Sequence, residues 1–211
     1  MADDSPCIYV LAGTNGSGKS SIAGAAFRAA GVPYVNPDDA ARRIREVHPG
    51  VAMQEANSAA WQEGRRLLER AIAERLWYAF ETTLGGATIT GLLETALLSG
   101  TEVRVWYVGL RSPELHIARV RARVARGGHD IPEERIRARF DSSRLNLIRL
   151  LPRLTELLLY DNSPEADPHA GLAPEPFLVL HVVHGKVVGS CDLKQTPAWA
   201  KPIVAAAMRG G

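Results

Sequence analysis

Cysteine is scarce in this sequence, and its scarcity excludes two kinds of small scaffold. Only Cys7 and Cys191 occur among the 211 residues, one near each end of the chain. Two cysteines so far apart supply neither a disulfide framework nor a cluster of zinc ligands. We interpret both as reduced thiols that pack inside the protein.

Long apolar runs and a strong net charge are also absent. No stretch approaches the ~20 apolar residues that span a bilayer, and the acidic stretch 1–6 lacks the basic and apolar regions of a signal peptide. The net charge is +2, which is too small to argue for a nucleic-acid partner. We therefore expect a cytoplasmic protein without a membrane partner, and the charge argues against a nucleic-acid partner.

One short glycine-rich stretch, residues 13–20, satisfies the complete phosphate-loop pattern. Two spaced glycines are followed there by lysine and a hydroxyl residue. An apolar run at 8–12 favours a strand before it, and an alanine-rich run at 21–30 favours a helix after it. In this setting backbone amides face an anion, Lys19 reaches the β- and γ-phosphates of ATP, and Ser20 offers its hydroxyl to Mg²⁺. The residues expected to bind ATP are Gly13, Thr14, Asn15, Gly16, Ser17, Gly18, Lys19, Ser20 and Ser21.

A second polar group follows the short extended piece at 34–35. Asn36 and Asp38 stand there, and ligands of open parallel sheets bind beyond the carboxyl ends of strands. Asp38 is therefore a candidate to accept a hydroxyl proton or hold a metal, and Asn36 is a candidate to bind substrate. The alternative is that one of them caps the helix that begins near residue 39.

A third polar group follows the apolar run at 77–80. Glu81, Thr82 and Thr83 come directly after it and are candidates to bind substrate, since a second polar cluster at the same sheet edge is what a site requires. The alternative is that the threonines cap the helix predicted at 88–99 and that Glu81 is solvated.

Arginines dominate the helix predicted from Ser112 to about residue 126. Arg119, Arg123 and Arg126 share one sector of this helix, which a solvated surface also explains. The helix ends at the sequence GGHDIP, residues 127–132, where glycines and proline supply a hinge before another arginine-bearing helix. We therefore predict a helical lid at about 112–140 that brings Arg119 and Arg123 to the transferred phosphoryl group.

The last part of the chain predicts a strand at 157–160, followed by Asn162 as a candidate contact to adenine or a turn residue. Two apolar runs around His184 and Gly185 predict a hairpin, and a terminal helix is predicted at 197–208. The hairpin and helix together occupy about 176–209.

These elements predict an α/β fold of the P-loop NTPase type, similar to nucleotide kinases. We expect three α/β/α layers around a mostly parallel central sheet, with a helical lid and a C-terminal β-hairpin, as a single domain over residues 1–211.

The ordered motifs resemble the zeta-toxin family of kinases, over about residues 6–163. The resemblance rests on the phosphate loop, NPD at 36–38, FETT at 80–83, SPE at 112–114 and the segment 119–132. It implies phosphorylation of UDP-N-acetylglucosamine by ATP and Mg²⁺, and it allows an antitoxin protein as a partner.

The resemblance also implies roles for single residues. Asp38 matches the family's general base, Glu81 and Thr83 match its substrate-binding segment, and Arg119 matches its first lid arginine. The second lid arginine falls on His129, which is therefore counted with the substrate-binding residues, and Arg123 is the nearest substitute for its charge.

The function expected from all this is ATP- and Mg²⁺-dependent phosphoryl transfer to a hydroxyl group of a small molecule, with a nucleotide sugar as the favoured acceptor. Two alternatives stay open: a kinase for another hydroxyl, such as a nucleoside, an antibiotic or a polynucleotide 5′-end, and a non-kinase ATP-binding switch protein.

Overall fold

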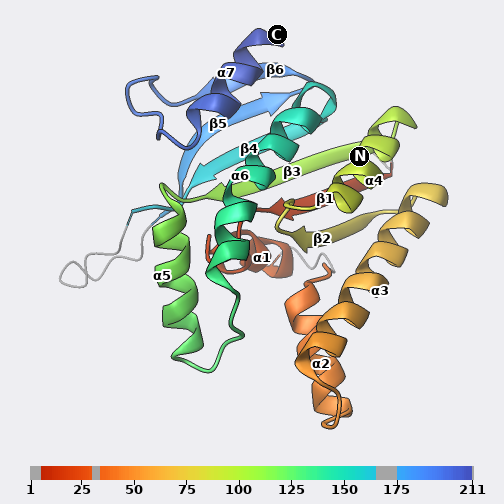
Figure 1. The fold of residues 1–211 in the computed structure, drawn as a ribbon. Helices are drawn as coiled ribbons and strands as arrows, with labels where there is room; N and C mark the ends of the chain where they lie inside the picture. Colours follow the sequence, from red (N-terminus) through yellow and green to blue (C-terminus); the bar gives the residue numbers. More distant parts are fainter. Residues whose placement is uncertain (1–5, 30–33, 165–174, 211) are drawn as a thin grey trace.

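A six-stranded β-sheet runs through the centre of the computed structural model, which describes residues 6–29, 34–164 and 175–210 (Figure 1). The strands lie in the order β2-β1-β3-β4-β5-β6. The first four are parallel, and β5 and β6 form an antiparallel hairpin next to β4. Their bounds are β1 Cys7–Ala12, β2 Tyr78–Thr82, β3 Glu102–Gly109, β4 Glu156–Asp161, β5 Phe177–Val183 and β6 Lys186–Ser190.

Seven α-helices and a short 3₁₀ turn complete the described residues. Their bounds are α1 Lys19–Ala29, α2 Pro37–Val47, α3 Met53–Ala73, α4 Ala87–Leu98, α5 Pro113–Val124, α6 Glu133–Leu150, η1 Leu151–Arg153 and α7 Lys201–Arg209. No helix among the described residues is long and apolar enough to cross a membrane. The acidic stretch 1–5 and the sequence 31–33 after the predicted first helix lie outside the described residues.

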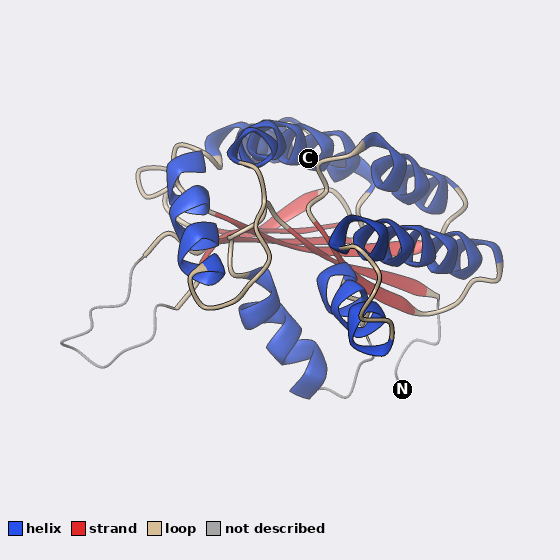
Figure 2. Ribbon diagram, turned by 60° about the horizontal axis from the view of Figure 1, so that its bottom comes forward, coloured by secondary structure: helices blue, strands red, loops and turns tan. Residues whose placement is uncertain are grey.

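The larger core lies on one face of the sheet, where Figure 2 shows most of the helices. There, alternate residues of the strands pack against apolar residues of α3, α4, α6 and α7, such as Leu68, Leu93, Leu147 and Ile203. The other face carries a smaller cluster around Phe27 of α1. This alternation follows from the two-residue period of a strand, and it confirms the predicted helical layers around a mostly parallel sheet.

The predicted hairpin is confirmed, and its turn has a clear local cause. His184 and Gly185 both adopt a positive φ, of 47° and 76°. A two-residue turn with positive φ at both positions matches the twist of the strands that it joins, and glycine adopts it without steric cost.

Val35 forms a parallel bridge with Phe80, so the extended piece at 34–35 lies beside β2, on the side away from β1. One predicted position needs correction. The terminal helix begins at Lys201, four residues later than predicted, because the preceding turn buries Trp199 against β3 and β4. Trp199 donates a hydrogen bond to Asp161 at 3.1 Å and stacks on Tyr107.

Candidate active site

The phosphate loop connects β1 to α1 as predicted, and its glycines explain its shape. Gly13, Gly16 and Gly18 have φ values of 141°, 83° and 84°. At Gly16 a Cβ atom would also stand 2.6 Å from the backbone oxygen of His116 in α5. A side chain there would push the loop away from the lid helix, so this position requires glycine on both counts.

Contacts from distant elements hold the loop in place. The side-chain amide of Asn162, after β4, donates to the backbone oxygen of Ser17 at 2.8 Å. The hydroxyl of Thr14 donates to the backbone oxygen of Arg139 in α6 at 3.3 Å. Asn162 is thus a support of the loop, while its contact with adenine stays a prediction. The hydroxyl of Ser17 is buried with no hydrogen-bond partner among the described residues, which leaves it available to a phosphate oxygen.

His116 joins the lid helix to the same loop. Its Nδ1 donates to the backbone oxygen of Asn15 at 2.8 Å, and its ring meets Phe140 edge-on. The pKa of His116 is lowered to about 4, chiefly by burial and also by the charges of Lys19 and Arg119, against the opposing effect of the Asn15 bond. The imidazole is therefore neutral at pH 7, and the proton on Nδ1 faces the loop.

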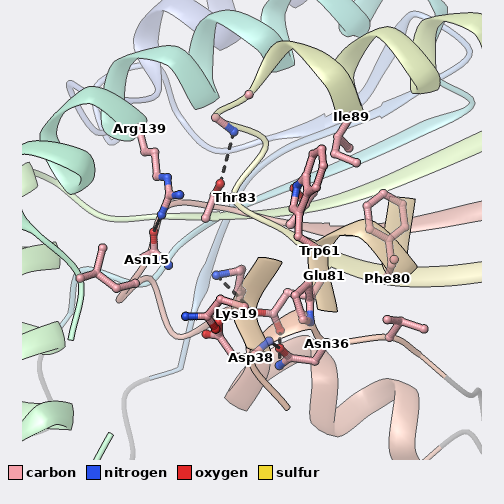
Figure 3. A pocket seen from close by; sticks show the side chains of 18 of the residues that line it. Asn15, Lys19, Asn36, Asp38, Trp61, Phe80, Glu81, Thr83, Ile89 and Arg139 are labelled. Carbon is pink, nitrogen blue, oxygen red and sulfur yellow. Dashed lines mark hydrogen bonds and ion pairs between the residues drawn. The ribbon is translucent and has the colours of Figure 1, made fainter. Parts of the chain in front are cut away.

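Lys19 forms a buried ion pair across the sheet edge with Glu81. The distance between Lys19 Nζ and Glu81 Oε1 is 3.3 Å, and the two residues are 7% and 5% exposed. The other carboxylate oxygen of Glu81 accepts a hydrogen bond from the amide of Asn36 at 3.1 Å (Figure 3). The alternative of a solvated Glu81 is therefore wrong.

Asn36 has a capping role as well as this contact. Its side-chain oxygen accepts a hydrogen bond from the backbone amide of Asp38 at 2.9 Å, which caps α2. The capping alternative for Asn36 is thus confirmed, and the same side chain still reaches Glu81 with its amide group. Asp38 lies in the first turn of α2, and its carboxylate is 3.9 Å from a guanidinium nitrogen of Arg123.

Thr82 and Thr83 do not cap α4, whose N-terminal cap is Gly86. Their hydroxyl oxygens instead accept hydrogen bonds from the backbone amides of Leu84 and Gly85, at 3.1 and 3.4 Å. These bonds shape the turn that follows β2 at the edge of the cavity. The capping alternative for the threonines is therefore wrong.

The predicted lid at about 112–140 covers α5, the segment 125–132 and the first part of α6, which form one of two helical arms that project from the sheet edge (Figure 1). The other arm is the hairpin of α2 and α3. The arms meet where Asn57 Nδ2 of α3 lies 3.5 Å from His129 Nε2. Arg123 supports the lid segment by donating to the backbone oxygen of His129 at 2.8 Å.

A cavity of about 470 Å³ opens between these arms. Lys19, Glu81 and Asp38 line it together with Asn57, Trp61, Arg65 and Ile89. Figure 3 shows Trp61, Phe80 and Ile89 on one side, with the charged groups facing them. A cavity with an apolar wall and a few converging polar groups is the usual form of a small-molecule site.

Of the predicted site residues, Asn15, Lys19, Asn36, Asp38, Glu81, Thr82, Thr83 and His129 line this cavity. Arg119 and Arg123 are half-buried on α5 and are not among the residues that line the cavity, although Arg123 contacts Asp38, which does line it. Ser20 is the second residue of α1, directly after the phosphate-loop lysine.

The structure adds Arg139, which the sequence analysis missed. Its guanidinium lines the cavity and donates to the side-chain oxygen of Asn15 at 2.8 Å. Burial lowers the pKa of Arg139, nearby Arg135 lowers it further, and Asp38 opposes both effects. Burial thus destabilises the charged form of Arg139, and an anionic group of a ligand bound beside the guanidinium would compensate for this. One arginine among several on α6 gave no sequence signal, because helical spacing does not show which neighbour a side chain meets.

The donor set fits Mg²⁺ in the way that phosphate-loop sites use it. Among the described residues there is no group of three or more His, Cys, Asp or Glu side chains that would hold a metal by themselves. Mg²⁺ is usually held by one or two protein oxygens together with substrate phosphates. The Ser20 hydroxyl, at the start of α1 beside the loop, is suited to that task.

Comparisons with known proteins agree with this geometry. Residues 1–161 match the family described as zeta toxin. A Haemophilus influenzae protein described as uncharacterized is 34% identical over 129 residues, which cover 61% of this chain and 88% of that protein.

Solved structures share the fold at low identity. The AvrRxo1-ORF1:AvrRxo1-ORF2 complex with sulphate ions gives a TM-score of 0.68 at 18% identity, over 90% of this chain and 62% of that chain, so this chain spans less than two thirds of its length. The same complex has been crystallised with ATP. A structure of the PezAT chromosomal toxin-antitoxin system of Streptococcus pneumoniae gives a TM-score of 0.55 at 16% identity, over 76% of this chain and 69% of that chain. Because the family match covers more than half of the chain, this protein belongs to the zeta toxin family.

Proposed function

We propose that this kinase transfers the γ-phosphoryl group of ATP to a hydroxyl group of a nucleotide sugar such as UDP-N-acetylglucosamine. The observation that carries the proposal is the single cavity in which the phosphate-loop lysine, Asp38 and Glu81 converge. A donor site and an acceptor site that share one cavity place the two reacting groups together, which supplies much of what phosphoryl transfer needs.

Asp38 is the proposed general base. Its carboxylate stands in the first turn of α2 and faces the cavity that Lys19 also lines. As the acceptor oxygen attacks the γ-phosphorus, its proton passes to the Asp38 carboxylate, and the bond from the γ-phosphorus to the β,γ-bridging oxygen breaks. The products are ADP and the phosphorylated acceptor.

The cations around the loop are proposed to stabilise the charge of the transferred group. Lys19 reaches the β- and γ-phosphates, and Arg119 and Arg123 approach from α5. Arg139 joins them from α6, because it lies in the cavity wall at Asn15 of the loop. A guanidinium fork at this place supplies the charge that the His129 position lacks. Mg²⁺, held by Ser20 and the phosphates, neutralises part of the phosphate charge when it is bound.

The acceptor is proposed to lie between β2 and α3. Glu81 and Thr83 with Asn36 provide hydrogen-bonding groups on one side, and His129 closes the cavity from the lid. Trp61 offers a flat apolar surface on the opposite side, which suits a planar ring such as a nucleobase. This combination of an aromatic wall and hydroxyl-binding groups supports a nucleotide sugar.

The direct test is mass spectrometry of products formed from Mg²⁺-ATP and a panel of nucleotide sugars, with wild type beside Asp38→Ala. We expect a product that is heavier by one phosphoryl group with wild type. The variant should lower the rate by at least about a hundred-fold, in the range of general-base catalysis, while it still binds ATP. A variant that keeps full activity would remove Asp38 from the mechanism. Absence of product from any nucleotide sugar would redirect the search to other hydroxyl acceptors.

We propose that the protein acts in the cytoplasm, where ATP is available. We also propose a protein antitoxin as its partner. The support is the fold similarity to a structure of the PezAT toxin-antitoxin system. The test is inhibition of product formation by the purified product of a gene adjacent to that of the kinase. Unchanged activity in a stable complex would contradict this role.

A further inference from the structure

One carboxylate holds together three parts of the active site. Glu81, the fourth residue of β2, contacts Lys19 of the phosphate loop through Oε1 and Asn36 of the α2 cap through Oε2. The distances are 3.3 Å and 3.1 Å. Through the cap, Asn36 connects this carboxylate to the helix turn that carries Asp38. Glu81 thus lies between the donor side and the acceptor side of the cavity.

The ammonium group that pairs with Glu81 is the group that binds the phosphates of ATP in phosphate-loop proteins. Lys19 is the loop residue whose ammonium group meets the β- and γ-phosphates in phosphate-loop proteins. Both partners are buried, and a buried charge requires a partner to compensate it. In this structure each group satisfies this requirement for the other. When phosphates arrive, Lys19 gains new anionic partners, and the Glu81 carboxylate is left beside negative charge.

We propose that Glu81 couples the two substrates by changing its partner: it pairs with Lys19 in the empty enzyme and binds the acceptor hydroxyl once the phosphates of ATP have taken over Lys19. This inference rests on the proposed kinase function. A carboxylate released from an ion pair is a strong hydrogen-bond acceptor, and a sugar hydroxyl is the donor that it lacks. ATP therefore prepares the acceptor site, and the two substrates bind with positive cooperativity.

The coupling has a structural restraint that keeps the carboxylate in place. The Asn36 amide holds Oε2 independently of Lys19, so loss of the ion pair frees Oε1 alone. The carboxylate then stays at the end of β2, where Thr83 and the cavity wall also face the acceptor. By thermodynamic reciprocity, the acceptor must strengthen ATP binding by the same factor.

The nucleotide arm of the test measures binding by calorimetry, without an acceptor. The probes are Mg²⁺ with the non-hydrolysable analogue AMP-PNP, and AMP, which lacks the β- and γ-phosphates. Glu81→Gln removes the competing charge but keeps an oxygen for Asn36, so we expect AMP-PNP to bind about ten-fold more tightly, a typical coupling factor. The affinity for AMP should stay within about two-fold, because AMP does not compete for Lys19.

Asp38→Asn is the matched control. Asp38 lines the same cavity, but its carboxylate pairs with Arg123 and not with Lys19. It reports the general effect of removing one negative charge beside the phosphates, which we expect to be less than about three-fold in a partly exposed position. If Glu81→Gln weakens AMP-PNP binding, or strengthens it no more than Asp38→Asn does, the proposal is overturned.

The acceptor arm titrates UDP-N-acetylglucosamine into wild type with and without saturating Mg²⁺-AMP-PNP. We expect the analogue to raise the acceptor affinity about ten-fold in wild type. Glu81→Gln should lose this gain. Equal affinity under both conditions in wild type would overturn the coupling. Absence of binding under both conditions would refute the nucleotide-sugar assignment instead, and the nucleotide arm would still decide the coupling.

A crystal structure of the wild-type chain with Mg²⁺-AMP-PNP gives a reading that needs no variant. The coupling requires Lys19 to contact phosphate oxygens and the 3.3 Å contact with Glu81 to be lost. An ion pair that persists at this distance beside a bound triphosphate would overturn the proposal, whether or not Glu81→Gln folds.

Discussion

Acidification from pH 7 to pH 5 should destabilise this protein through one buried side chain, His116. This residue is only 1% exposed, and its Nδ1 donates to the backbone of Asn15. Protonation of the other ring nitrogen would place a positive charge in the protein interior, close to the charges of Lys19, Arg119 and Arg144. The folded state therefore resists protonation of His116, whereas the unfolded chain does not.

The magnitude follows from the shift in pKa. Burial lowers the pKa of His116 from its ordinary 6.5 to about 4 in the folded protein. The stabilisation is fully present above pH 6.5 and is progressively lost as the pH falls toward 4, because the unfolded state binds the proton first. Between pH 7 and pH 5, linkage gives a loss of about 2 kcal/mol in the free energy of unfolding.

The assay is urea denaturation of wild type and His116→Gln at both pH values. Carboxylates titrate in the same range, so the informative quantity is the difference between the two proteins in their loss of stability. We expect wild type to lose about 2 kcal/mol more than the variant does between pH 7 and pH 5. His48→Gln serves as the control, because His48 is exposed and should leave the wild-type response unchanged.

Equal pH responses of wild type and His116→Gln would refute this reasoning. They would show that the imidazole is protonated in the folded state at pH 5, or that the loop and α5 separate before His116 titrates. Kinase activity at pH 5 distinguishes these two causes, since separation of the loop from α5 would also lower the rate of phosphoryl transfer.

Two further predictions concern contacts that the sequence analysis did not foresee. Arg139→Lys keeps the positive charge but loses the guanidinium that binds Asn15, so we expect kcat to fall at least about ten-fold in a steady-state assay with folding unchanged. Ser143→Ala removes a buried hydroxyl that accepts from Tyr107 at 2.8 Å and donates to the backbone oxygen of Thr83 at 2.6 Å. Both partners lose a hydrogen bond, and we expect a loss of about 1–3 kcal/mol in the free energy of unfolding, measured in urea.

Each of these predictions has a control variant, the same substitution at an exposed position. Arg137→Lys, two residues from Arg139, alters an exposed arginine that pairs with Glu114 across the lid, and kcat should stay within about two-fold. Ser58→Ala alters an exposed serine of α3 and should change stability by less than about 0.5 kcal/mol. An Arg139→Lys enzyme as fast as Arg137→Lys, or a Ser143→Ala protein as stable as Ser58→Ala, would contradict the role assigned to the contact.

The sequence alone determined the features whose causes are local. The phosphate loop is a contiguous pattern, and its glycines supply the positive φ values that its shape requires. The same is true of the strands, the helices on either side of residues 127–132 and the hairpin turn at His184 and Gly185. They follow from the periodicity of apolar residues, from helix-breaking glycine and proline, and from turn-forming residues. The polar residues predicted near strand ends, Asp38 and Glu81, line one cavity, because parallel strands bring their carboxyl ends to one edge.

Only the tertiary structure decided which of these residues meet. Sequence spacing did not show that Glu81 pairs with Lys19, that Arg139 enters the cavity, or that His116 is buried against the loop. These contacts join residues that are more than 60 positions apart in the chain. Helical and strand periodicity specify the side of an element that a residue occupies, whereas the neighbour on that side depends on strand order and on the packing of the helices across the sheet.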